Sequence, residues 1–484
     1  MNCKLIIKDE VNIKCEGLDV ATRRKICNKL KYDLPYARHM PAYKLGRWDG
    51  TVSFFGIGGS GYLAHLDVIL PIITDSGYEI EVIDNRQAAE LKFEKITESY
   101  WADRGKVWPK GHQLAGQPIV LRDYQYDVVN KFLDNPQSLQ EVATGAGKTI
   151  TTATLSHLCE PYGRTIVIVP NKSLVVQTEE DYINLGLDVG VYFGDRKELG
   201  KTHTVCTWQS LNVLDKKGKY DDALTLAEFL EGVNAVIIDE VHQAKADVLK
   251  KLLTINLKNA PIRWGLTGTV PKQAWEFQGI LAGIGPVINQ VTAHDLQEKD
   301  VLAKLDIQIL QTKNIEEFRN YQEEYTWLVT DPDRISWISS KVKEFSRTGN
   351  TLVLVNRIDT GKKIMEQIPE AVFVAGEMKL ADRKEEYDEI KTSDGKVIIA
   401  TYGVAAVGIN IPRIFNLVLL EPGKSFVRVI QSIGRGIRKA DDKDFVQIWD
   451  ITSTCRFAKR HLTKRKAFYK EANYPFTVEK ADWN

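Results

Sequence analysis

Short runs of hydrophobic residues of strand length alternate with segments of helical spacing through most of this chain. Between residue 119 and about residue 300 the runs are Thr165–Val169, Val189–Phe193, Thr204–Cys206, Ala235–Ile238 and Arg263–Leu266. The rhythm then starts again with Leu305–Leu310, Thr351–Val355, Ala371–Val374, Val397–Ala400, Leu417–Leu420 and Phe445–Trp449. Such alternation is typical of β-α-β units around a parallel sheet. We therefore expect two α/β domains in tandem, at residues 119–298 and 299–455.

The regions on either side of these domains have a different pattern. Residues 1–85 predict a small α+β domain, with strands at 4–7, 11–14, 51–55 and 79–83 and helices at 20–32 and 63–70. Pro71 is expected to end or kink the second helix, because proline interrupts the helical hydrogen bonds. Residues 86–118 lack periodicity and predict a connector, and the basic residues 456–484 predict a helical tail.

Composition indicates a globular protein of the cytosol. The chain has 484 residues, 43% hydrophobic and 27% charged, and none of its apolar runs is long enough for a membrane helix. Its six cysteines are scattered, without a C-x-x-C pair, so neither a disulfide framework nor a zinc site is expected. The net charge of +1 leaves a local basic face possible, since whole-chain charge averages such a face away.

A glycine-rich segment, Ala143–Thr149, follows a predicted strand end and precedes a predicted helix. Glycines allow backbone N–H groups to face phosphates, and the start of the helix favours negative charge. The expected ligands of ATP here are Thr144, Gly145, Ala146, Gly147, Lys148 and Thr149, with Lys148 on the β- and γ-phosphates and Thr149 on Mg²⁺. The eight-residue form of this motif begins with glycine, where this chain has Val142.

Asp239 and Glu240 close the apolar strand that precedes them. In parallel sheets, ligands bind at the carboxyl ends of the strands. We expect Asp239 to hold Mg²⁺ and Glu240 to orient and deprotonate the attacking water, because phosphoryl transfer needs both roles.

Two further groups complete the expected ATP site. Gln125, close to Arg122, offers the donor and acceptor that match the edge of adenine. Arg435 and Arg438 are three residues apart, so a helix would place both guanidinium groups on one face. With Gln431 before them, they suit the charge on the γ-phosphate in the transition state. The two arginines lie far from the phosphate loop in sequence, which suggests a nucleotide held between two domains.

These segments follow in the order found in superfamily 2 helicases of the DExH type, which the chain resembles over roughly residues 119–455. The matching segments are Gln125, Ala143–Thr149, Pro170–Gln177, Thr207–Ser210, Asp239–His242, Leu266–Thr269, Leu354–Arg357, Ala400–Pro412 and Gln431–Arg438. The resemblance implies an α/β fold with two tandem RecA-like parallel-sheet domains, preceded here by the small α+β domain. It implies nucleotide contacts from Gly408 and Asn410, although many members have aspartate where this chain has Asn410. The strand-contacting residues that it implies are Pro170, Asn171, Lys172, Thr207, Gln209, Asn356, Arg357 and Thr401.

The segment Tyr43–Gly50 resembles the start of phage helicases of the UvsW type. This resemblance implies a phage protein of the host-cell cytoplasm that remodels branched or double-stranded DNA, such as Holliday junctions and stalled forks. We also expect a monomer, with recombination proteins as further partners. Arg47 is then a candidate DNA contact, and Trp48 beside it either stacks on a base or packs inside the small domain. The helix with Arg23–Lys31 and the basic tail are further candidate DNA surfaces.

Two other functions stay open on the sequence alone. An RNA helicase would carry the same motor motifs, since they contact phosphates and sugars. An ATP-gated nucleic-acid-binding subunit would use the motion for a partner, although Glu240 and the paired arginines favour hydrolysis.

Overall fold

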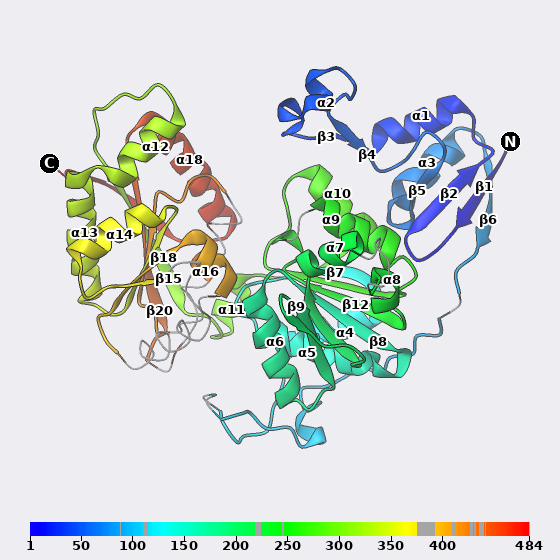
Figure 1. Ribbon diagram of the computed structural model, residues 1–484, viewed down its shortest axis with the longest axis horizontal. Coiled ribbons are helices and arrows are strands. Elements are labelled where there is room, and N and C mark those ends of the chain that lie inside the picture. The colour runs from blue at the N-terminus through cyan, green and yellow to red at the C-terminus, as the bar shows by residue number, and fades with distance from the viewer. Residues whose placement is uncertain are drawn as a thin grey trace. The chain divides into compact units, whose positions relative to one another are not determined.

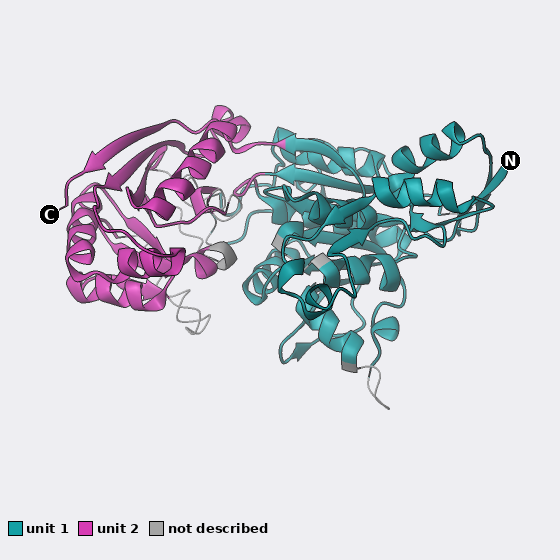
Figure 2. Cartoon of the chain, turned by 90° about the horizontal axis from the view of Figure 1, so that it is seen from above, with its two compact units in different colours: residues 1–142, 147–290 teal, residues 143–146, 291–484 magenta. Residues whose placement is uncertain are grey.

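The chain folds into two compact units. The computed structural model describes residues 1–483 except 88, 111, 113, 218–223, 244–245, 375–392, 409–412, 426–428, 430–431, 435–439 and 441. The first unit comprises residues 1–142 and 147–290, and the second comprises 143–146 and 291–484 (Figure 2). The division after residue 290 lies eight residues before the expected one (299 − 291). Within the described residues, no helix combines the length and apolar character that crossing a membrane requires.

The N-terminal region is a four-stranded sheet with two helices, in agreement with the predicted α+β domain. The strand order is β5-β2-β1-β6, and only β1 and β6 are parallel. The elements are β1 (Asn2–Ile7), β2 (Asn12–Glu16), α1 (Val20–Lys29), β5 (Ser60–Tyr62), α3 (Leu66–Asp75) and β6 (Glu79–Asp84). Ile26, Ile69 and Ile73 from the two helices are buried in the core of this region.

Helix α3 does not end at Pro71, the first of the two effects expected of this proline, because Pro71 lies inside the helix. A 3₁₀ turn at Leu63–His65 precedes the helix, which continues to Asp75. A proline inside a helix costs about 3 kcal/mol. Ile69 and Ile73 are fully buried on one face, on either side of the proline. Burying the two side chains is worth about 3–6 kcal/mol, which is enough to hold the helix together through the proline.

A second hairpin projects from this region (Figure 1). The predicted helix 20–32 stops at Lys29, and Lys31–Asp33 instead forms β3, which pairs with β4 (Thr51–Ser53). Between these strands lie a 3₁₀ turn at Ala37–His39 and the short helix α2 (Pro41–Lys44). The segment between β3 and β4 therefore contains two helical turns.

The connector is held firmly against the first α/β domain. Trp101 is 1% exposed, and its indole N–H donates to Thr154 Oγ1 at 2.9 Å. The ring of Phe93 lies 5.9 Å from that of Trp264. Residues 86–118 contain a 3₁₀ turn at Ala102–Arg104 and no named strand among those described. They are therefore a fixed part of the first unit.

The first α/β domain is built on an eight-stranded sheet of order β10-β9-β11-β8-β12-β13-β7-β14. Strands β9, β11, β8, β12, β13 and β7 run parallel to one another, whereas β10 is antiparallel to β9. The strands are β7 (Gln137–Val142), β8 (Arg164–Val169), β9 (Val189–Phe193), β10 (Arg196–Lys197), β11 (His203–Thr207), β12 (Val233–Asp239), β13 (Ile262–Thr267) and β14 (Val287–Val291). The helices are α4 (Asp123–Asp134), α5 (Lys148–Cys159), α6 (Lys172–Asn184), α7 (Trp208–Lys217), α8 (Leu226–Phe229), α9 (Ala246–Lys251), α10 (Ala274–Gly283) and α11 (Ala293–Glu298), the last within the second unit.

The second α/β domain has a seven-stranded parallel sheet of order β17-β18-β16-β19-β20-β15-β21. The strands are β15 (Lys304–Thr312), β16 (Thr351–Val355), β17 (Val372–Val374), β18 (Val397–Thr401), β19 (Asn416–Leu420), β20 (Phe445–Ser453) and β21 (Phe476–Ala481). The helices are α12 (Tyr321–Thr330), α13 (Pro332–Ser346), α14 (Ile358–Gln367), α16 (Tyr402–Gly408) and α18 (Arg456–Glu471). The two parallel sheets confirm the predicted fold class.

The expected basic tail is wrong as a separate segment. Residues 456–471 do form a helix, α18, but Leu462, Arg465 and Tyr469 on it are buried. The chain then adds β21 beside β15, in the same sheet as the rest of the domain. Residues 456–484 therefore belong to the second α/β domain.

Candidate nucleotide site and nucleic-acid contacts

Five predicted segments meet at the carboxyl edge of the first sheet. The register pairs Asp239 with Leu266 and Leu266 with Gln140, so the ends of β12, β13 and β7 lie level. On the other side of β12, Ile238 pairs with Ile168, and Val169 pairs with Thr207. The parallel strand order therefore gathers residues that lie far apart in the sequence along one edge.

The phosphate loop connects β7 to α5. Gly145 and Gly147 have φ angles of 91° and 78°, in the left-handed region that glycine adopts most easily. A Cβ on Gly147 would lie 2.6 Å from Nε2 of Gln125, so no larger residue fits there without moving that amide. Helix α5 begins immediately after, at Lys148. The loop thus has the form that a phosphate cradle needs.

Lys148 and Glu240 form a buried ion pair. The Nζ of Lys148 lies 2.7 Å from Oε1 of Glu240, and the two side chains are 8% and 6% exposed. The same Nζ donates to the carbonyl oxygen of Val142 at 3.4 Å. The ammonium group therefore contacts both the end of β7, where the phosphate loop starts, and the carboxylate of Glu240, which follows β12.

The carboxylate of Glu240 is stabilised in its charged form. Burial raises its pKa, but the charges of Lys148 and His242 outweigh burial, and the net pKa is lowered. Oε2 also accepts the backbone N–H of Gly268 at 3.2 Å. Glu240 itself has a φ of 52°, a conformation that costs a non-glycine residue about 1–2 kcal/mol. These contacts fix a charged carboxylate at the position expected for the base.

The residues that the sequence predicts to bind adenine lie at the start of α4. Gln125 is 6% exposed on α4, and its Oε1 accepts the backbone N–H of Arg122 at 2.9 Å. Its Nε2 faces Gly147, as the steric test above shows. Arg122 is exposed at the start of the helix, where its guanidinium donates to the hydroxyl of Tyr124 at 3.1 Å. The amide that is expected to bind adenine therefore lies beside the phosphate loop.

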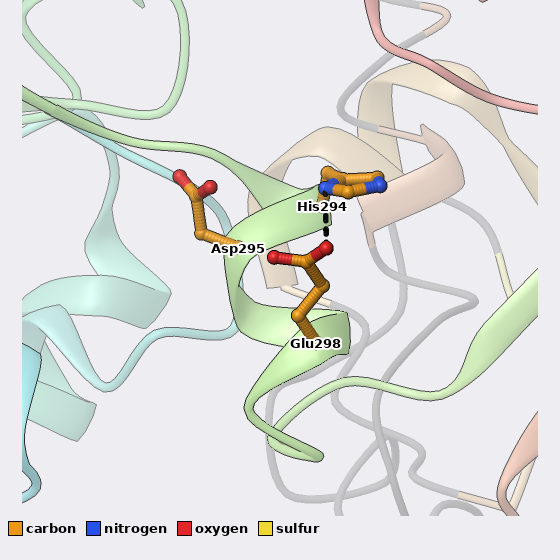
Figure 3. A group of neighbouring side chains, drawn as sticks. All are labelled: His294, Asp295 and Glu298. Atoms are coloured by element: carbon orange, nitrogen blue, oxygen red, sulfur yellow. Dashed lines mark ion pairs between the residues drawn. The ribbon is translucent and has the colours of Figure 1, made fainter.

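These residues fit ATP, and a hydroxyl and a carboxylate fit Mg²⁺. Thr149 is the second residue of α5, Asp239 ends β12, and α5 packs against β12. Oxygen ligands of this kind are the ones that Mg²⁺ prefers. One other group of possible metal ligands occurs in the described part of the chain, at His294, Asp295 and Glu298 on α11 (Figure 3). There Asp295 Oδ2 accepts the N–H of Thr292 as a helix cap, and Glu298 is exposed, so nothing favours a metal.

The strand-contacting residues of the first domain lie near the same edge, with different degrees of exposure. Asn171 caps α6 through its Oδ1, and its Nδ2 is buried without a partner among the described residues. Gln209 is exposed and donates to the buried Pro170 carbonyl at 3.2 Å, while Lys172 is exposed. Thr207 is 4% exposed, and its hydroxyl pairs with that of Ser210 at 2.9 Å. Lys172 and Gln209 fit a role at the surface, whereas Pro170 is buried and Thr207 serves as a buried helix cap.

The second domain holds its predicted residues at the corresponding edge of its own sheet. Val355 pairs with Thr401, so Asn356 and Arg357 begin where β18 ends. Both nitrogens of the Arg357 fork bind Asp359, at 2.9 and 2.7 Å. Thr401 accepts the N–H of Val404 at the start of α16. Two of the donors of Arg357, the residue expected to contact DNA, are therefore bound to Asp359.

Several predicted residues fall outside the described part of the chain. These are Asn410, Gln431, Arg435 and Arg438. Gly408 is the last residue of α16. In the N-terminal region, Arg47 is exposed, whereas Trp48 is half-buried and donates its indole N–H to the carbonyl of Thr51 at 2.8 Å. Trp48 is therefore engaged within its own loop.

The sequence reasoning missed a buried ionic network in the second domain. Arg465 on α18 binds both carboxylate oxygens of Asp450, at 2.8 and 2.9 Å, and both side chains are fully buried. Arg334 similarly pairs with Glu421 at 2.9 Å. A signal for Arg465 was present, because it falls on the apolar face formed by Ala458, Leu462 and Tyr469.

Comparison with known proteins agrees with this geometry. Residues 118–272 match the family described as type III restriction enzyme, res subunit, and residues 334–440 match the helicase conserved C-terminal domain. The ATP-dependent DNA helicase uvsW of phage T4 is 23% identical over 96% of this chain and 92% of its own length. A putative DNA 3'-5' helicase Rad25 of Haloarcula marismortui is 25% identical over 72% of this chain and 56% of its own.

Among solved structures, the ATP-dependent type ISP restriction-modification enzyme LlaBIII bound to DNA has a TM-score of 0.55 at 16% identity, covering 83% of this chain and 33% of that one. This likeness concerns the fold. Together with the two family matches and the order of the motifs, it agrees with the parallel-sheet architecture described above. The chain therefore belongs to the superfamily 2 helicases of the DExH type and is similar to the phage helicases of the UvsW type.

Proposed function

We propose that this ATP-dependent DNA helicase remodels branched DNA, driving branch migration of Holliday junctions and regression of stalled forks in phage recombination and repair. The observation that carries the proposal is the N-terminal region, which is fixed to the first motor domain. Asn12 Nδ2 donates to the carbonyl of Thr254 at 2.9 Å, and His65 Nε2 lies 2.7 Å from Gln278 Oε1. A region attached in this way can deliver DNA to the motor in a defined position.

The similarity to the phage T4 helicase supports the same reading. It extends over 96% of the chain and so includes the N-terminal region, whereas the similarity to the archaeal relative covers 72%. A motor alone explains translocation, but a branch-remodelling enzyme also needs a second DNA surface. We propose that residues 1–85 supply it, with Arg47 among the contacts.

ATP hydrolysis would use the residues at the carboxyl edge of the first sheet. Lys148 binds the β- and γ-phosphates, Gln125 reads adenine, and Thr149 and Asp239 hold Mg²⁺. Bound ATP and Mg²⁺ supply the reactive phosphoryl group and its charge neutralisation. Glu240 positions the attacking water and accepts its proton, which it can do because its carboxylate is held in the charged form. Arg435 and Arg438 keep the role inferred from the sequence, stabilising charge on the γ-phosphoryl group.

Binding of phosphate at Lys148 competes directly with Glu240. The 2.7 Å ion pair occupies the ammonium group that the phosphates need. When the triphosphate binds, Lys148 moves its main contact to the phosphate oxygens, and the carboxylate becomes available to the water. The same exchange is expected at Arg357, from Asp359 to a DNA phosphate. Both exchanges link ligand binding to local rearrangement at the two sheet edges.

The test is a comparison of substrates at one fixed salt concentration, because phosphate contacts depend strongly on salt. ATPase rate and product formation are measured with single-stranded, linear duplex, forked and four-way DNA and with matched RNA. The expected result is ATP-driven conversion of four-way and forked DNA, abolished by Lys148→Ala and Glu240→Gln. Lys131→Ala is the control, because this half-buried lysine of α4 pairs with Asp127 and is not among the residues assigned to the nucleotide site.

Two outcomes would contradict the proposal. Stimulation by RNA without stimulation by DNA would make the protein an RNA helicase. Tight DNA binding without turnover of ATP would make it an ATP-gated binding subunit. We further propose that one chain acts alone in the cytoplasm of the host cell, and sedimentation of the DNA complex tests the first part.

A further inference from the structure

The loop between β3 and β4, residues 34–50, exposes apolar side chains that are unusual for a surface loop. Met40, Tyr43 and Leu45 are 41%, 43% and 65% exposed. The same seventeen-residue stretch (50 − 34 + 1) contains Arg38, His39, Lys44 and Arg47, all exposed. A loop that exposes both apolar and basic side chains fits a nucleic acid, whose bases are flat and apolar and whose backbone is negative.

The ring of Tyr43 is built into this surface. A Cβ added to Gly50 would lie 2.9 Å from two atoms of the Tyr43 ring and from the Cβ of Ala37. The ring therefore packs one side onto Gly50 and Ala37, and only glycine at position 50 leaves room for it. Ala37 is 4% exposed, while Tyr43 keeps 43% of its surface open to solvent. The geometry is that of a supported aromatic platform.

The loop around the platform is rigid. The N–H of Leu34 donates to the carbonyl of Gly50, and that of Arg47 donates to Ala42, each at 2.9 Å. Trp48 is tied to Thr51 at 2.8 Å, so the tryptophan that the sequence suggested for stacking is already engaged. Holding Tyr43 in place beforehand reduces the entropy lost when a base stacks on it.

The charges of the loop favour an anion. Its one acid, Asp49, is paired with Lys31 at 2.6 Å and also accepts the Thr51 hydroxyl. Within the described residues, Arg38, Lys44 and Arg47 form no ion pair with an acid. Three cationic side chains of the same loop thus have no neutralising acid among the described residues, and a phosphate backbone supplies one.

The loop is also anchored to the motor. The ring of Tyr36 meets that of Trp275 on α10 edge-on, at 5.7 Å and 74°. Helix α10 begins seven residues after Thr267, the residue whose hydroxyl contacts His242 of the ATP site (274 − 267). A base held on this loop is therefore held at a fixed place relative to the first motor domain.

We propose that Tyr43 is a stacking platform for an unpaired base at the branch of the DNA substrate, with Arg38, Lys44 and Arg47 binding the adjacent phosphates. The proposal rests on the proposed function and adds to it the element that recognises the branch. Duplex DNA offers no open base face except at its ends, so the platform distinguishes a fork or junction from linear duplex. Arg47 and its neighbours alone would bind both equally.

The experiment uses the full chain and a fork that carries 2-aminopurine at the branch, beside a linear duplex of equal length. Wild type, Tyr43→Ala and Tyr43→Trp are compared in affinity and in quenching of the probe. Base–aromatic stacking predicts that Tyr43→Ala weakens fork binding about 5- to 100-fold and abolishes the quenching. Tyr43→Trp restores both, and binding of linear duplex changes less than twofold. Leu199→Ala, another exposed apolar residue of the first unit, is the control and leaves fork binding unchanged.

Each other outcome decides against the platform. Fork binding and quenching by Tyr43→Ala that equal the wild type overturn it and leave the apolar surface for a protein partner. If Tyr43→Ala loses the same affinity for the fork and for the linear duplex, Tyr43 contributes to DNA binding in general and does not recognise the branch. If the wild type and Tyr43→Ala both convert forks and bind them with equal affinity, only this inference is rejected. A wild type that ignores branches rejects the proposed function as well.

Discussion

The buried pair of Lys148 and Glu240 gives the sharpest test of the site. Replacing Lys148 with methionine removes the cation and leaves the Glu240 carboxylate buried, with His242 and the Gly268 N–H as its remaining partners. Breaking a buried ion pair from one side costs about 3–5 kcal/mol. Because those two partners remain, we expect the low end, about 3 kcal/mol of unfolding free energy. Glu240→Gln, which leaves the ammonium group unpaired, should cost about the same.

The double variant should be less destabilised than the sum of the two. With both charges gone, only polar contacts are lost in addition, so the loss of unfolding free energy should stay at about 3 kcal/mol. Additive effects would give about 6 kcal/mol. The assay is urea unfolding of the four proteins, followed by tryptophan fluorescence of the first unit, which contains the buried Trp101 and Trp264. We expect all three variants to lose ATPase activity, so only their unfolding free energies show whether the two groups interact.

The pH dependence of the unfolding free energy is an independent test of the ion pair. In the wild type the pKa of Glu240 is lowered, so the stabilisation is present above the unfolded carboxyl pKa and is lost as pH falls through the folded value. In Lys148→Met, burial dominates and raises that pKa. The destabilisation should therefore be largest at neutral pH and shrink as pH falls and Glu240 is protonated. Two results would show that Lys148 and Glu240 do not interact in solution. One is a loss of unfolding free energy in the double variant that equals the sum of the two single losses; the other is a loss in Lys148→Met that does not change with pH.

Three further predictions concern other parts of the molecule. Gln125→Ala should raise KM for ATP about tenfold and reduce the preference for ATP over GTP, with a smaller change in kcat, because the amide reads the base and takes no part in the chemistry; equal KM values for both proteins would contradict this role. Arg465→Met should lower the unfolding free energy of the second unit by about 3–5 kcal/mol in urea melts, since it leaves Asp450 buried without its cationic partner, whereas replacing the exposed Lys464 on the same helix with methionine should change it little. His461, whose pKa burial and the nearby Arg465 lower to about 4, should make stability decline as pH falls from about 6.5 to about 4, and His461→Asn should flatten that decline in melting temperature; an unchanged slope would refute the assignment.

The sequence was sufficient wherever the determining residues are neighbours in the chain. The phosphate loop needs glycines, a lysine and a helix start within one short segment, and Gly147, Lys148 and α5 lie where the motif predicts. The strands are continuous runs of apolar residues, and for that reason the two parallel sheets could be predicted with most of their strands. Asp239 and Glu240 were placed correctly because a buried strand directly precedes them.

Prediction was wrong where a distant partner decides the local structure. The peptide at residues 31–33 forms β3 because β4 pairs with it, although its own spacing continues the helix. Helix α3 runs through Pro71 because two isoleucines are buried in a core made by other elements. Trp48 is exposed or buried according to the fold of its loop, which the residue itself does not reveal.

What the sequence determines by itself is the set of chemical groups and the local elements that hold them: a phosphate loop, an acid pair after a strand, and two series of β-α-β units. Only the tertiary structure decides which of these groups meet. Lys148 and Glu240 are 92 positions apart, and strand order brings them within 2.7 Å. Arg465 reads as a surface residue of a basic helix, yet it is buried against Asp450 because β20 and α18 pack together. The physical reason is that strand pairing and burial are long-range: their free energy depends on residues that no local window contains.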